Sequence, residues 1–448
     1  MRIELITNLF DPDKLAGASL FTDMALYLRD QGHDVWVTTT FSYYPAWALQ
    51  PEDKGTSVRD EMFQGIPVRR VHMYVPRRVT GATRLLSDLS FLFSLLRYGR
   101  HRGRHPEIVV TAMPMLSQCL AQRFLYAGQK IPRFITVKDF VVEAALDLGI
   151  LKAPGFAPLL YGLQRWALRS AQALSTISPY MLERLERNVG KDRPISVIPD
   201  WIHKDLQTEI DRQMPSAPAR TPGLLFYSGN LGVKQGLPGF LDQFHAASGT
   251  ELGWSLRING GGAEKNLLES AVATKFGTRI GPVQEEEGYV RSLLEAAAYL
   301  VTQRPGVGAN FLPSKLLPAL ATGTPVLAVC DFKSPLGKEV LDGGFGEVVA
   351  PGDATTLKAV LQKWKNEPGS LVEMSQAARK WAKRYERKSV LGLYEAEFVK
   401  LVNVPAPSQA GNAESLSDSL PGKDTPRGGY HPLKKRLGRN IGLNIGGK

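Results

Sequence analysis

Strand-like and helix-like segments alternate along this chain, and the alternation occurs in two series. In the first series, strand character occurs in RIELITN, HDVWVTT, PEIVVTAM, PRFITVKDF and QALSTIS, with helical stretches between them. After Pro222 the alternation restarts with LLFYSGN, SLRINGG, TRIGPV, YLVTQ, PVLAVC and GEVVA. Strands that alternate with helices predict parallel sheets with crossover connections. Two such series predict an α/β protein built from two doubly wound, Rossmann-like domains.

A polar stretch separates the two series, PDWIHKDLQTEIDRQMPSAPARTPG, and its four prolines are typical of a linker. We place the boundary between residues 203 and 204, which divides 448 residues into two domains of ordinary size. Helices near residues 375–385 and 390–402 close the folded part. The segment 404–448 is rich in Pro, Gly and Ser and lacks apolar periodicity, so we expect a disordered basic tail.

The net charge of +12 is concentrated in two segments. Nine arginines accompany one acid, Asp88, between Arg69 and Arg104, and seven Lys or Arg accompany three acids in residues 404–448. In the first segment an apolar face recurs at helical spacing, formed by Leu85, Leu86, Leu89, Leu92, Phe93 and Leu96. This pattern fits a helix on an anionic membrane surface, a solvated charged face, or a helix packed in the core. Nucleic acid is the less favoured partner, because the rest of the two-domain body is neutral.

The cysteines, the apolar runs and the histidines bear on the cellular compartment and on metal binding. Cys119 and Cys330 lie in apolar stretches far apart in the chain, so we expect reduced core residues of a cytoplasmic protein. The apolar run LLSDLSFLFSLLRYG is too short to span a bilayer, and MRIELITNLF has strand character and not that of a signal peptide. The histidines have no metal-ligand spacing, and the DPD triplet at residues 11–13 is explained by a turn, so we predict no metal site.

A glycine-rich loop follows the first strand of the second series, in YSGNLGVKQGL. Gly229, Gly232 and Gly236 permit a tight turn and close approach of the backbone to a ligand. The next helix is expected to begin near Leu237, and Lys234 lies in the loop before it. A lysine in such a loop suits a diphosphate, although the spacing matches neither the P-loop nor the GxGxxG pattern.

Two more loops are expected to open onto the same cleft, because loops at the carboxyl ends of parallel strands share one edge. One contains Gly260, Gly261 and Gly262 after SLRIN. The other begins at Arg304 and leads to a Pro-Ser-Lys triplet, where we expect Ser314 to cap a helix from Lys315 to Thr322. The free N–H groups of that helix, with Lys315 and Arg304, would face an anion.

The first domain contributes two candidate residues to the cleft. Gly17 lies in the turn between the first strand and helix, where the chain can come close to a ligand. Asp139 lies at the end of the strand in PRFITVKDF and is expected to face the cleft between the domains. By contrast, Ser178 and Pro179 are expected simply to cap and start a helix.

These segments, in this order, resemble the retaining glycosyltransferases of family four, which have the GT-B fold. The resemblance covers about residues 1 to 402 and is closest to the branch of colanic acid and other bacterial exopolysaccharides. The segments that carry it are DKLAGASLFTDMALYLRDQGHDV, FSYYPAW, HMYVPRR, VKDFVVEAALDLGIL, TISPYMLERL, VIPDW, YSGNLGVKQGL, QRPGVGANFLPSKLLPALATGTPVLAV and EVVAPGD.

The resemblance implies a C-terminal domain (204–384) that holds a nucleotide-diphosphate sugar and an N-terminal domain (1–203) that holds an acceptor. A final helix (385–403) returns to the first domain. Lys234 matches the loop lysine of the family, and Ser314 and Lys315 match the Pro-Ser-Lys of this branch. The family needs no bound metal or cofactor, and its donor is a nucleotide sugar that is UDP- or GDP-linked.

The chain departs from the family pattern at three positions. Many members carry two glutamates eight positions apart, where this chain has Asn310 and Pro318. Asn230 replaces a residue that is commonly basic. We therefore expect donor contacts from Gly17, Gly229, Asn230, Gly232, Gly261, Arg304, Asn310 and Ser314.

The predicted reaction transfers a sugar, hexosyl or deoxyhexosyl, with retention to a lipid-linked or other saccharide acceptor. Lys234 and Lys315 would stabilise the departing diphosphate, and Asp139 would orient the acceptor hydroxyl. The predicted location is the cytoplasmic, inner face of the plasma membrane, with the protein bound peripherally. The alternative function is a catalytically silent sugar-nucleotide-binding scaffold of a polysaccharide assembly complex, because both glutamates are missing.

Overall fold

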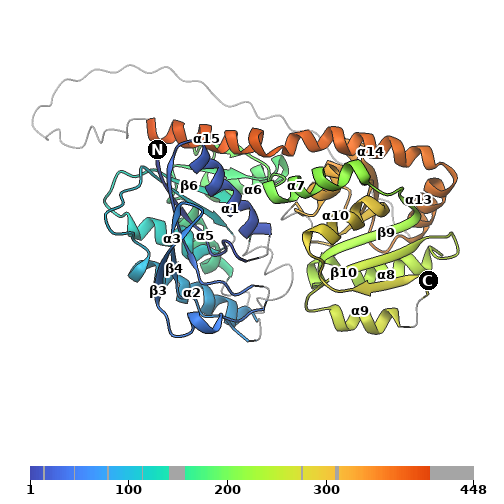
Figure 1. The fold of residues 1–448 in the computed structure, drawn as a ribbon, viewed down its shortest axis with the longest axis horizontal. Coiled ribbons are helices and arrows are strands. Elements are labelled where there is room, and N and C mark those ends of the chain that lie inside the picture. Colours follow the sequence, from blue (N-terminus) through green and yellow to red (C-terminus); the bar gives the residue numbers. More distant parts are fainter. Residues whose placement is uncertain are drawn as a thin grey trace, which may run out of the picture. The chain divides into compact units, whose positions relative to one another are not determined.

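The first series of strands forms an eight-stranded sheet in the order β3-β4-β2-β1-β5-β6-β7-β8 (Figure 1). All neighbouring strands are parallel except β3 and β4. The strands are β1 (Arg2–Ile6), β2 (Asp34–Thr40), β3 (Val58–Phe63), β4 (Ile66–Val71), β5 (Ile108–Met113), β6 (Arg133–Val137), β7 (Ala173–Thr176) and β8 (Ile195–Val197). The helices of this half are α1 (Ala16–Asp30), α2 (Gly81–Tyr98), α3 (Leu116–Leu125), α5 (Ala157–Leu168) and α6 (Pro179–Val189).

The second series forms a six-stranded, fully parallel sheet in the order β11-β10-β9-β12-β13-β14. Its strands are β9 (Thr221–Asn230), β10 (Ser255–Gly261), β11 (Thr278–Gly281), β12 (Ala296–Thr302), β13 (Val326–Val329) and β14 (Gly346–Val349). Its helices are α7 (Lys204–Gln213), α8 (Leu237–Ala246), α9 (Lys265–Val272), α10 (Glu286–Glu295), α11 (Leu316–Ala321), α12 (Pro335–Gly343), α13 (Ala354–Asn366) and α14 (Pro368–Ala382). This is the Rossmann order, in which a ligand crevice opens between the first and fourth strands, here β9 and β12.

The structure is a computed structural model that describes residues 1–13, 16–44, 46–77, 80–113, 115–140, 157–273, 276–307 and 312–403. The predicted tail at 404–448 and the predicted donor residue Asn310 lie outside the described residues. The described part belongs to one compact unit, Met1–Val404. The predicted α/β architecture of two parallel sheets is confirmed.

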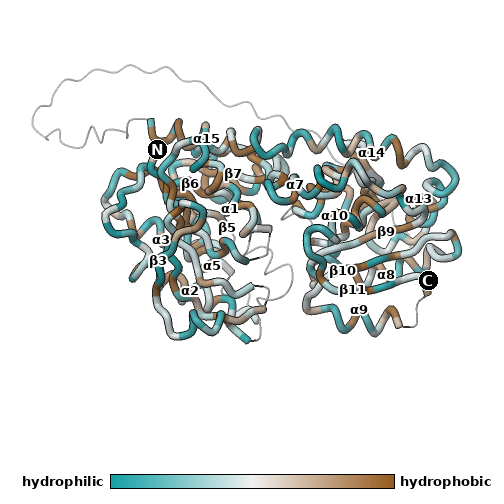
Figure 2. Tube along the Cα trace, in the orientation of Figure 1, coloured by the Kyte–Doolittle hydropathy of each residue, from teal (hydrophilic) through white to brown (hydrophobic). Residues whose placement is uncertain are grey.

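Hydrophobic residues concentrate on the central strands of each sheet and on the helix faces that cover them (Figure 2). β5 is buried along its whole length, as are β12 and β13, which explains why these strands have continuous apolar runs. Cys119 and Cys330 are buried and unpaired, as the sequence predicted. Ser178 caps α6 by accepting a hydrogen bond from the amide of Tyr180, with Pro179 at the first helical position, also as predicted.

A β-hairpin at one edge of the first sheet was missed by the sequence analysis. β3 and β4 pair antiparallel across a turn at Gln64 and Gly65, both of which have positive φ (44° and 83°). Two central residues with positive φ form the kind of turn that matches the twist of paired strands. β3 contains no buried residue and β4 alternates between buried and half-buried residues over its first four positions, so charged side chains obscured both strands in the sequence.

The last helix, α15 (Arg387–Asn403), packs on the first sheet although it follows the second in sequence. Val390, Leu391, Tyr394 and Phe398 are buried in the N-terminal core. A buried carboxylate fixes the helix, because Asp23 accepts hydrogen bonds from Arg387 Nε at 2.7 and 2.9 Å. Figure 1 shows α14 and α15 following one another along the two halves.

Candidate active site

The glycine loop after β9 is built for close backbone packing. Gly229 has a φ of 139° and Gly236 a φ of 64°, which other residues rarely adopt. Between them a short 3₁₀ turn, Val233–Gln235, carries Lys234. Gly236 then serves as the N-cap of α8, which begins at Leu237 as the sequence predicted. The loop thus brings backbone and one cation to the crevice between β9 and β12.

Lys315 lies against this loop. Its Nζ donates a hydrogen bond to the hydroxyl of Tyr227 at 2.7 Å and lies 4.0 Å from the centre of the Tyr227 ring. A Cβ atom added at Gly229 would stand 3.1 Å from the same Nζ, so a larger residue there would require the ammonium to shift. The glycine loop and the Pro-Ser-Lys triplet therefore meet at one point, although 86 positions separate Gly229 from Lys315 in the sequence.

Burial changes the protonation of Lys315. The residue as a whole is half-buried, but its ammonium group is removed from water, and this lowers the pKa of Lys315 to about 7. Tyr227 stays neutral, because burial raises its pKa well above the usual value. A bound diphosphate would favour the charged ammonium, so the site is poised to take up an anion together with a proton.

The predicted cap at Ser314 is wrong. α11 begins at Leu316, Lys315 occupies the cap position, and Ser314 is exposed and makes no capping hydrogen bond with its side chain. The cause is a tight turn in which the amides of Leu316 and Leu317 donate to the carbonyls of Pro313 and Ser314, both at 3.1 Å. Two amides that were expected to face an anion are therefore occupied, and the lysine side chain is left as the main source of positive charge.

Lys234 forms an ion pair with Asp139, which was also predicted to take part in catalysis. Its Nζ lies 3.0 Å from Oδ2 of Asp139, and both side chains are less than one third exposed. Asp139 follows β6, so this pair connects the carboxyl end of a strand in the first sheet to the glycine loop of the second. The remaining oxygen of Asp139, Oδ1, is buried and has no hydrogen-bond partner within the described part of the chain.

The loop after β12 packs directly on the glycine loop. The amide of Arg304 donates to the carbonyl of Lys234 at 2.8 Å, and a Cβ at Gly236 would stand 3.1 Å from Cα of Arg304. Arg304 is an exposed residue. Its positive charge lowers the pKa of Glu264, but burial of the Glu264 carboxyl has the larger effect, and the pKa is raised. Arg304 is thus positioned at the rim of the crevice, as expected from its place after β12.

The loop at Gly260–Gly262, after β10, also packs against the glycine loop after β9. The amide of Leu231 donates to the carbonyl of Gly261 at 2.9 Å. A Cβ at Gly262 would stand 2.5 Å from the side-chain oxygen of Asn230, so Asn230 is turned toward this loop. Gly232 has an extended backbone, and a Cβ there would also meet Asn230, at 3.1 Å. The structure therefore brings Asn230, Gly232 and Gly261 together.

Gly17 is separate from this group. It lies in the first turn of α1, and no atom lies within 4 Å of where its Cβ would be. The open space beside Gly17 agrees with room for a ligand, but the structure gives no contact between Gly17 and the three loops of the second sheet.

Sequence reasoning missed three residues of the crevice. Tyr227 holds Lys315, while Glu264 and Gln303 contain buried side-chain atoms that have no hydrogen-bond partner in the described residues: Oε2 of Glu264 and both polar atoms of Gln303. Buried polar atoms are normally satisfied, so these atoms are available to a bound molecule. Their positions in the sequence could have identified them, because Gln303 directly follows β12 and Glu264 directly precedes α9.

Metal-ligand clusters and membrane-spanning helices are absent from the described residues. No group of three or more His, Cys, Asp or Glu side chains there could hold a metal ion. No helix among them has the length and hydrophobicity needed to cross a membrane.

Comparison with known proteins agrees with this geometry. Residues 18–201 match the model of the glycosyl transferase 4-like domain. The chain is 28% identical over 342 residues to the putative colanic acid biosynthesis glycosyl transferase WcaI of Escherichia coli (strain K12), covering 72% of this chain and 82% of that protein. It is 22% identical over 290 residues to the probable glycosyltransferase WbjE of Pseudomonas aeruginosa, covering 61% of this chain and 69% of that protein.

Solved structures share the fold across nearly the whole length. Sucrose-phosphate synthase (tll1590) from Thermosynechococcus elongatus superimposes with a TM-score of 0.68 at 14% identity, covering 90% of this chain and 99% of that one. Anabaena Alr3699/HepE in complex with UDP superimposes with a TM-score of 0.60 at 12% identity, covering 89% of this chain and all of that one.

Two parallel Rossmann-type sheets, with a last helix that returns to the first, define the GT-B fold. The match of residues 18–201 and the two relatives support a glycosyltransferase of the family-four type, similar to proteins of exopolysaccharide biosynthesis. The resemblance inferred from the sequence is thereby confirmed, and the comparisons support a glycosyltransferase function in polysaccharide biosynthesis.

Proposed function

We propose that this protein transfers a hexosyl or deoxyhexosyl group, with retention of anomeric configuration, from a UDP- or GDP-linked donor to a lipid-linked saccharide. The observation that carries the proposal is the contact between Lys315 and the Gly229 loop, with Lys234 on the same loop, at the crevice between β9 and β12. UDP in the solved HepE complex supports a nucleoside diphosphate as the ligand.

The mechanism uses positive charge in place of an enzymic nucleophile. The bond between the anomeric carbon and the donor phosphate oxygen breaks, and negative charge grows on the diphosphate. Lys234 and Lys315 stabilise this charge more strongly in the transition state than in the bound donor. The acceptor oxygen bonds to the same face of the anomeric carbon, and its proton passes to the leaving phosphate oxygen, which preserves the configuration.

Asp139 has two roles in this proposal. Before the donor binds, its Oδ2 holds Lys234 at 3.0 Å and keeps the ammonium at the crevice. Its unpartnered Oδ1 can accept a hydrogen bond from the acceptor hydroxyl and so orient that hydroxyl toward the anomeric carbon. The diphosphate then competes with Asp139 for Lys234.

The proposed transfer is metal-independent, because the two lysines, with Arg304 at the rim, can neutralise the diphosphate. The test is transfer in the presence of a chelator, compared with transfer in added Mg²⁺ or Mn²⁺. Equal rates support the proposal. Loss of transfer that returns with added metal contradicts it.

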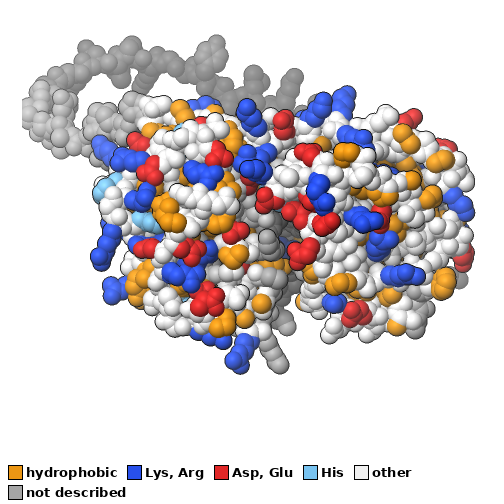
Figure 3. All heavy atoms as spheres, viewed as in Figure 1, with side chains coloured by type: hydrophobic (Ala, Val, Ile, Leu, Met, Phe, Trp, Pro, Cys, Tyr) orange, Lys and Arg blue, Asp and Glu red, His pale blue; other side chains and the backbone are white. Residues whose placement is uncertain are grey.

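We place the protein on the cytoplasmic face of the plasma membrane, bound peripherally through α2. Most of its predicted apolar face is exposed, since Leu85, Leu86, Leu89, Phe93 and Leu96 are 52, 50, 54, 69 and 43% exposed. Leu92 of that face is instead partly buried and packs against the core. Asp88 turns inward and accepts a hydrogen bond from the amide of Ser117 at 3.1 Å. Figure 3 shows hydrophobic, basic and acidic side chains close together over the region where Figure 1 labels α2. An apolar face edged by cations suits an anionic membrane.

The proposed activity is tested by thermal-shift measurements with a panel of sugar nucleotides, followed by transfer and hydrolysis assays. Lys315→Ala is expected to lower turnover by about 100-fold or more, because one charge-stabilising group at a leaving anion is worth that much. A change of only a few fold would contradict the assignment. Tight binding of a sugar nucleotide with neither transfer nor hydrolysis would favour the silent scaffold.

A further inference from the structure

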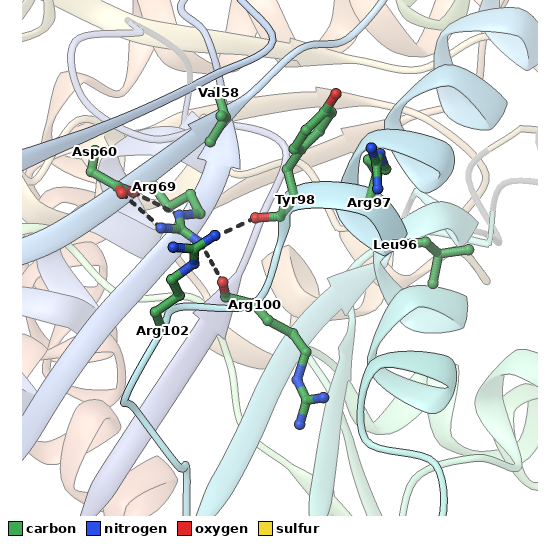
Figure 4. Close-up of a pocket in the computed structure, with 8 residues that line it drawn as sticks. All are labelled: Val58, Asp60, Arg69, Leu96, Arg97, Tyr98, Arg100 and Arg102. Carbon is green, nitrogen blue, oxygen red and sulfur yellow. Dashed lines mark hydrogen bonds and ion pairs between the residues drawn. The ribbon is translucent and has the colours of Figure 1, made fainter.

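A cavity of about 400 Å³ opens at the C-terminal end of α2, far along the chain from the crevice residues. Four arginines and one aspartate contribute to its lining: Arg69, Arg97, Arg100, Arg102 and Asp60 (Figure 4). The proposed glycosyl transfer uses none of these residues. Their positive charge is in excess, so the cavity requires an explanation.

Arg69 forms the fixed floor of the cavity. Its Nε and one terminal nitrogen each lie 2.6 Å from an oxygen of Asp60, which is a bidentate pair. The other terminal nitrogen donates to the carbonyl of Tyr98 at 3.3 Å and also to that of Arg100. Figure 4 shows these bonds converging from β3, β4 and the segment after α2. The charge of Arg69 is thus matched by Asp60, and the guanidinium holds the chain after α2 in place.

Arg97 and Arg102 carry the excess charge. Both residues are exposed, and neither forms an ion pair with a carboxylate in the part of the chain that the structure describes. Arg102 also lines a second cavity of about 340 Å³, next to Arg104. Arg100 is oriented differently, since its guanidinium lies 5.5 Å from the centre of the Tyr126 ring and points away from Arg69 in Figure 4. Two guanidinium groups therefore border one cavity without an anion.

The cavity continues the apolar face of α2. Leu96 lines it and is the last of the exposed apolar residues on that helix. With 3.6 residues per turn, Leu85, Leu86, Leu89, Phe93 and Leu96 fall within an arc of about 100°, and Arg97 follows directly at the border of that arc. A ligand that uses both features must be apolar along one part and anionic at the end, which describes an amphiphile with a phosphate headgroup.

The position of the cavity separates it from the reacting groups. Asp139 follows β6 at the carboxyl edge of the first sheet, whereas α2 leads back to the start of β5, where Ile108 pairs with Ile3 at the amino edge. A helix of 18 residues is about 27 Å long. The strand residues of the cavity are on β3 and β4, and β2, β1 and β5 lie between β4 and β6, which precedes Asp139. This separation suits an anchor and not the reacting acceptor.

We propose that this cavity binds the phosphate headgroup of an anionic membrane phospholipid, between Arg97 and Arg102, while the exposed face of α2 inserts among the acyl chains. The inference rests on the proposed peripheral membrane location and adds a specific headgroup site to it. Arginine is well suited to this role, because its planar fork binds phosphate oxygens in pairs.

The experiment compares binding of the full chain to vesicles of phosphatidylcholine with and without phosphatidylglycerol, by flotation. Arg97→Gln/Arg102→Gln is expected to weaken binding to the anionic vesicles by roughly thirtyfold, since each arginine near an anionic surface contributes about fivefold. The matched control, Arg187→Gln/Arg291→Gln, removes two arginines that are 69 and 71% exposed on α6 and α10. Its binding is expected to stay within a few fold. Equal losses in the two double variants would overturn the headgroup site and leave only general charge attraction.

A second arm distinguishes a lipid headgroup from free phosphate. Calorimetry compares dihexanoyl-phosphatidylglycerol, below its micelle concentration, with inorganic phosphate. Tighter binding of the lipid, lost in Arg97→Gln/Arg102→Gln, supports the proposal. Equal binding of inorganic phosphate would overturn it, because α2 would then contribute nothing. Leu89→Ser/Phe93→Ser is expected to weaken vesicle binding without abolishing the preference for anionic vesicles.

Thermal unfolding and nucleotide binding of each variant provide the folding control. Both are expected to be unchanged in Arg97→Gln/Arg102→Gln, because neither arginine touches the crevice. If the chain binds anionic vesicles through these arginines but neither transfers nor hydrolyses any sugar nucleotide, the proposed function fails and the headgroup site stands. If transfer is observed and Arg97→Gln/Arg102→Gln binds vesicles as tightly as Arg187→Gln/Arg291→Gln, the proposed function stands and the headgroup site fails.

Discussion

Lys234 and Asp139 form an ion pair of 3.0 Å that connects the glycine loop of the second sheet to the carboxyl end of β6 in the first. The two residues are 95 positions apart in the sequence and come from the two halves that hold donor and acceptor in the proposed reaction. The donor phosphate and Asp139 therefore compete for one ammonium.

Asp139→Asn is expected to change nucleotide affinity and turnover in opposite directions. Removing the competing carboxylate should tighten UDP or GDP binding by up to about fivefold, the range of a partly exposed ion pair. Turnover should fall by about tenfold or more, because the acceptor hydroxyl loses its orienting oxygen. Calorimetry and steady-state kinetics measure the two effects. If affinity and turnover fall together, Asp139 shapes the donor site and does not compete with the donor.

Nucleotide affinity should depend on pH through Lys315. Burial lowers the pKa of Lys315 to about 7, so its ammonium is present below pH 7 and is lost as the pH rises through that value. A diphosphate favours the ammonium, so affinity should fall above pH 7, by at most tenfold per pH unit. Calorimetry at pH 8 in buffers of different ionisation enthalpy should reveal proton uptake on binding. Lys315→Met should remove that uptake, and uptake that persists in this variant would assign it to another group.

Gly229→Ala tests the close approach of the loop to Lys315. The new Cβ would stand 3.1 Å from Nζ, on a backbone with a φ of 139° that alanine adopts only with strain. Nucleotide affinity is expected to fall by about tenfold, and the free energy of unfolding by about 1–3 kcal/mol. Gly239→Ala is the matched control, since it lies within α8 with no atom within 4 Å of the new Cβ. Equal affinities of the two variants would show that Lys315 moves aside without consequence.

Arg387→Ala should loosen the return of the last helix to the first sheet. Asp23 is only 4% exposed, and it also accepts a hydrogen bond from Nε1 of Trp201 at 2.8 Å. Removing the arginine leaves a buried carboxylate without its counter-charge, which is expected to cost about 3 kcal/mol in the free energy of unfolding. Urea denaturation measures this loss. Lys388→Ala, at an exposed neighbouring position on α15, should cost less than about 0.5 kcal/mol. If both variants lose a similarly small free energy of unfolding, the apolar contacts of α15 alone stabilise its packing on the first sheet.

Local signals were sufficient for most of the elements. The apolar runs of β5, β12 and β13, the cap at Ser178 and the start of α8 at Leu237 all follow from residue type and spacing, because burial and backbone geometry act over a few residues. The β3–β4 hairpin was missed because its turn, Gln64-Gly65, is not among the strongest turn signals and its strands carry many charges.

The candidate site was also predicted only in part from the sequence. The sequence identified Lys234, Lys315 and the glycines as residues suited to a diphosphate. It gave the wrong cap at Ser314, because the turn at Pro313 is decided by backbone bonds that spacing does not reveal. It also missed Tyr227, which accepts a hydrogen bond from Lys315, and Glu264 and Gln303, which contain buried atoms without partners in the described residues.

The order of residue types along the chain determined two parallel α/β domains and a diphosphate-binding chemistry, since strand, helix and loop preferences are local. Only the tertiary structure decided that burial lowers the pKa of Lys315 to about 7, that Lys234 is held by Asp139, and that most of the apolar face of α2 remains uncovered. These properties depend on which distant groups exclude water from a side chain, and burial of that kind is created when the chain folds.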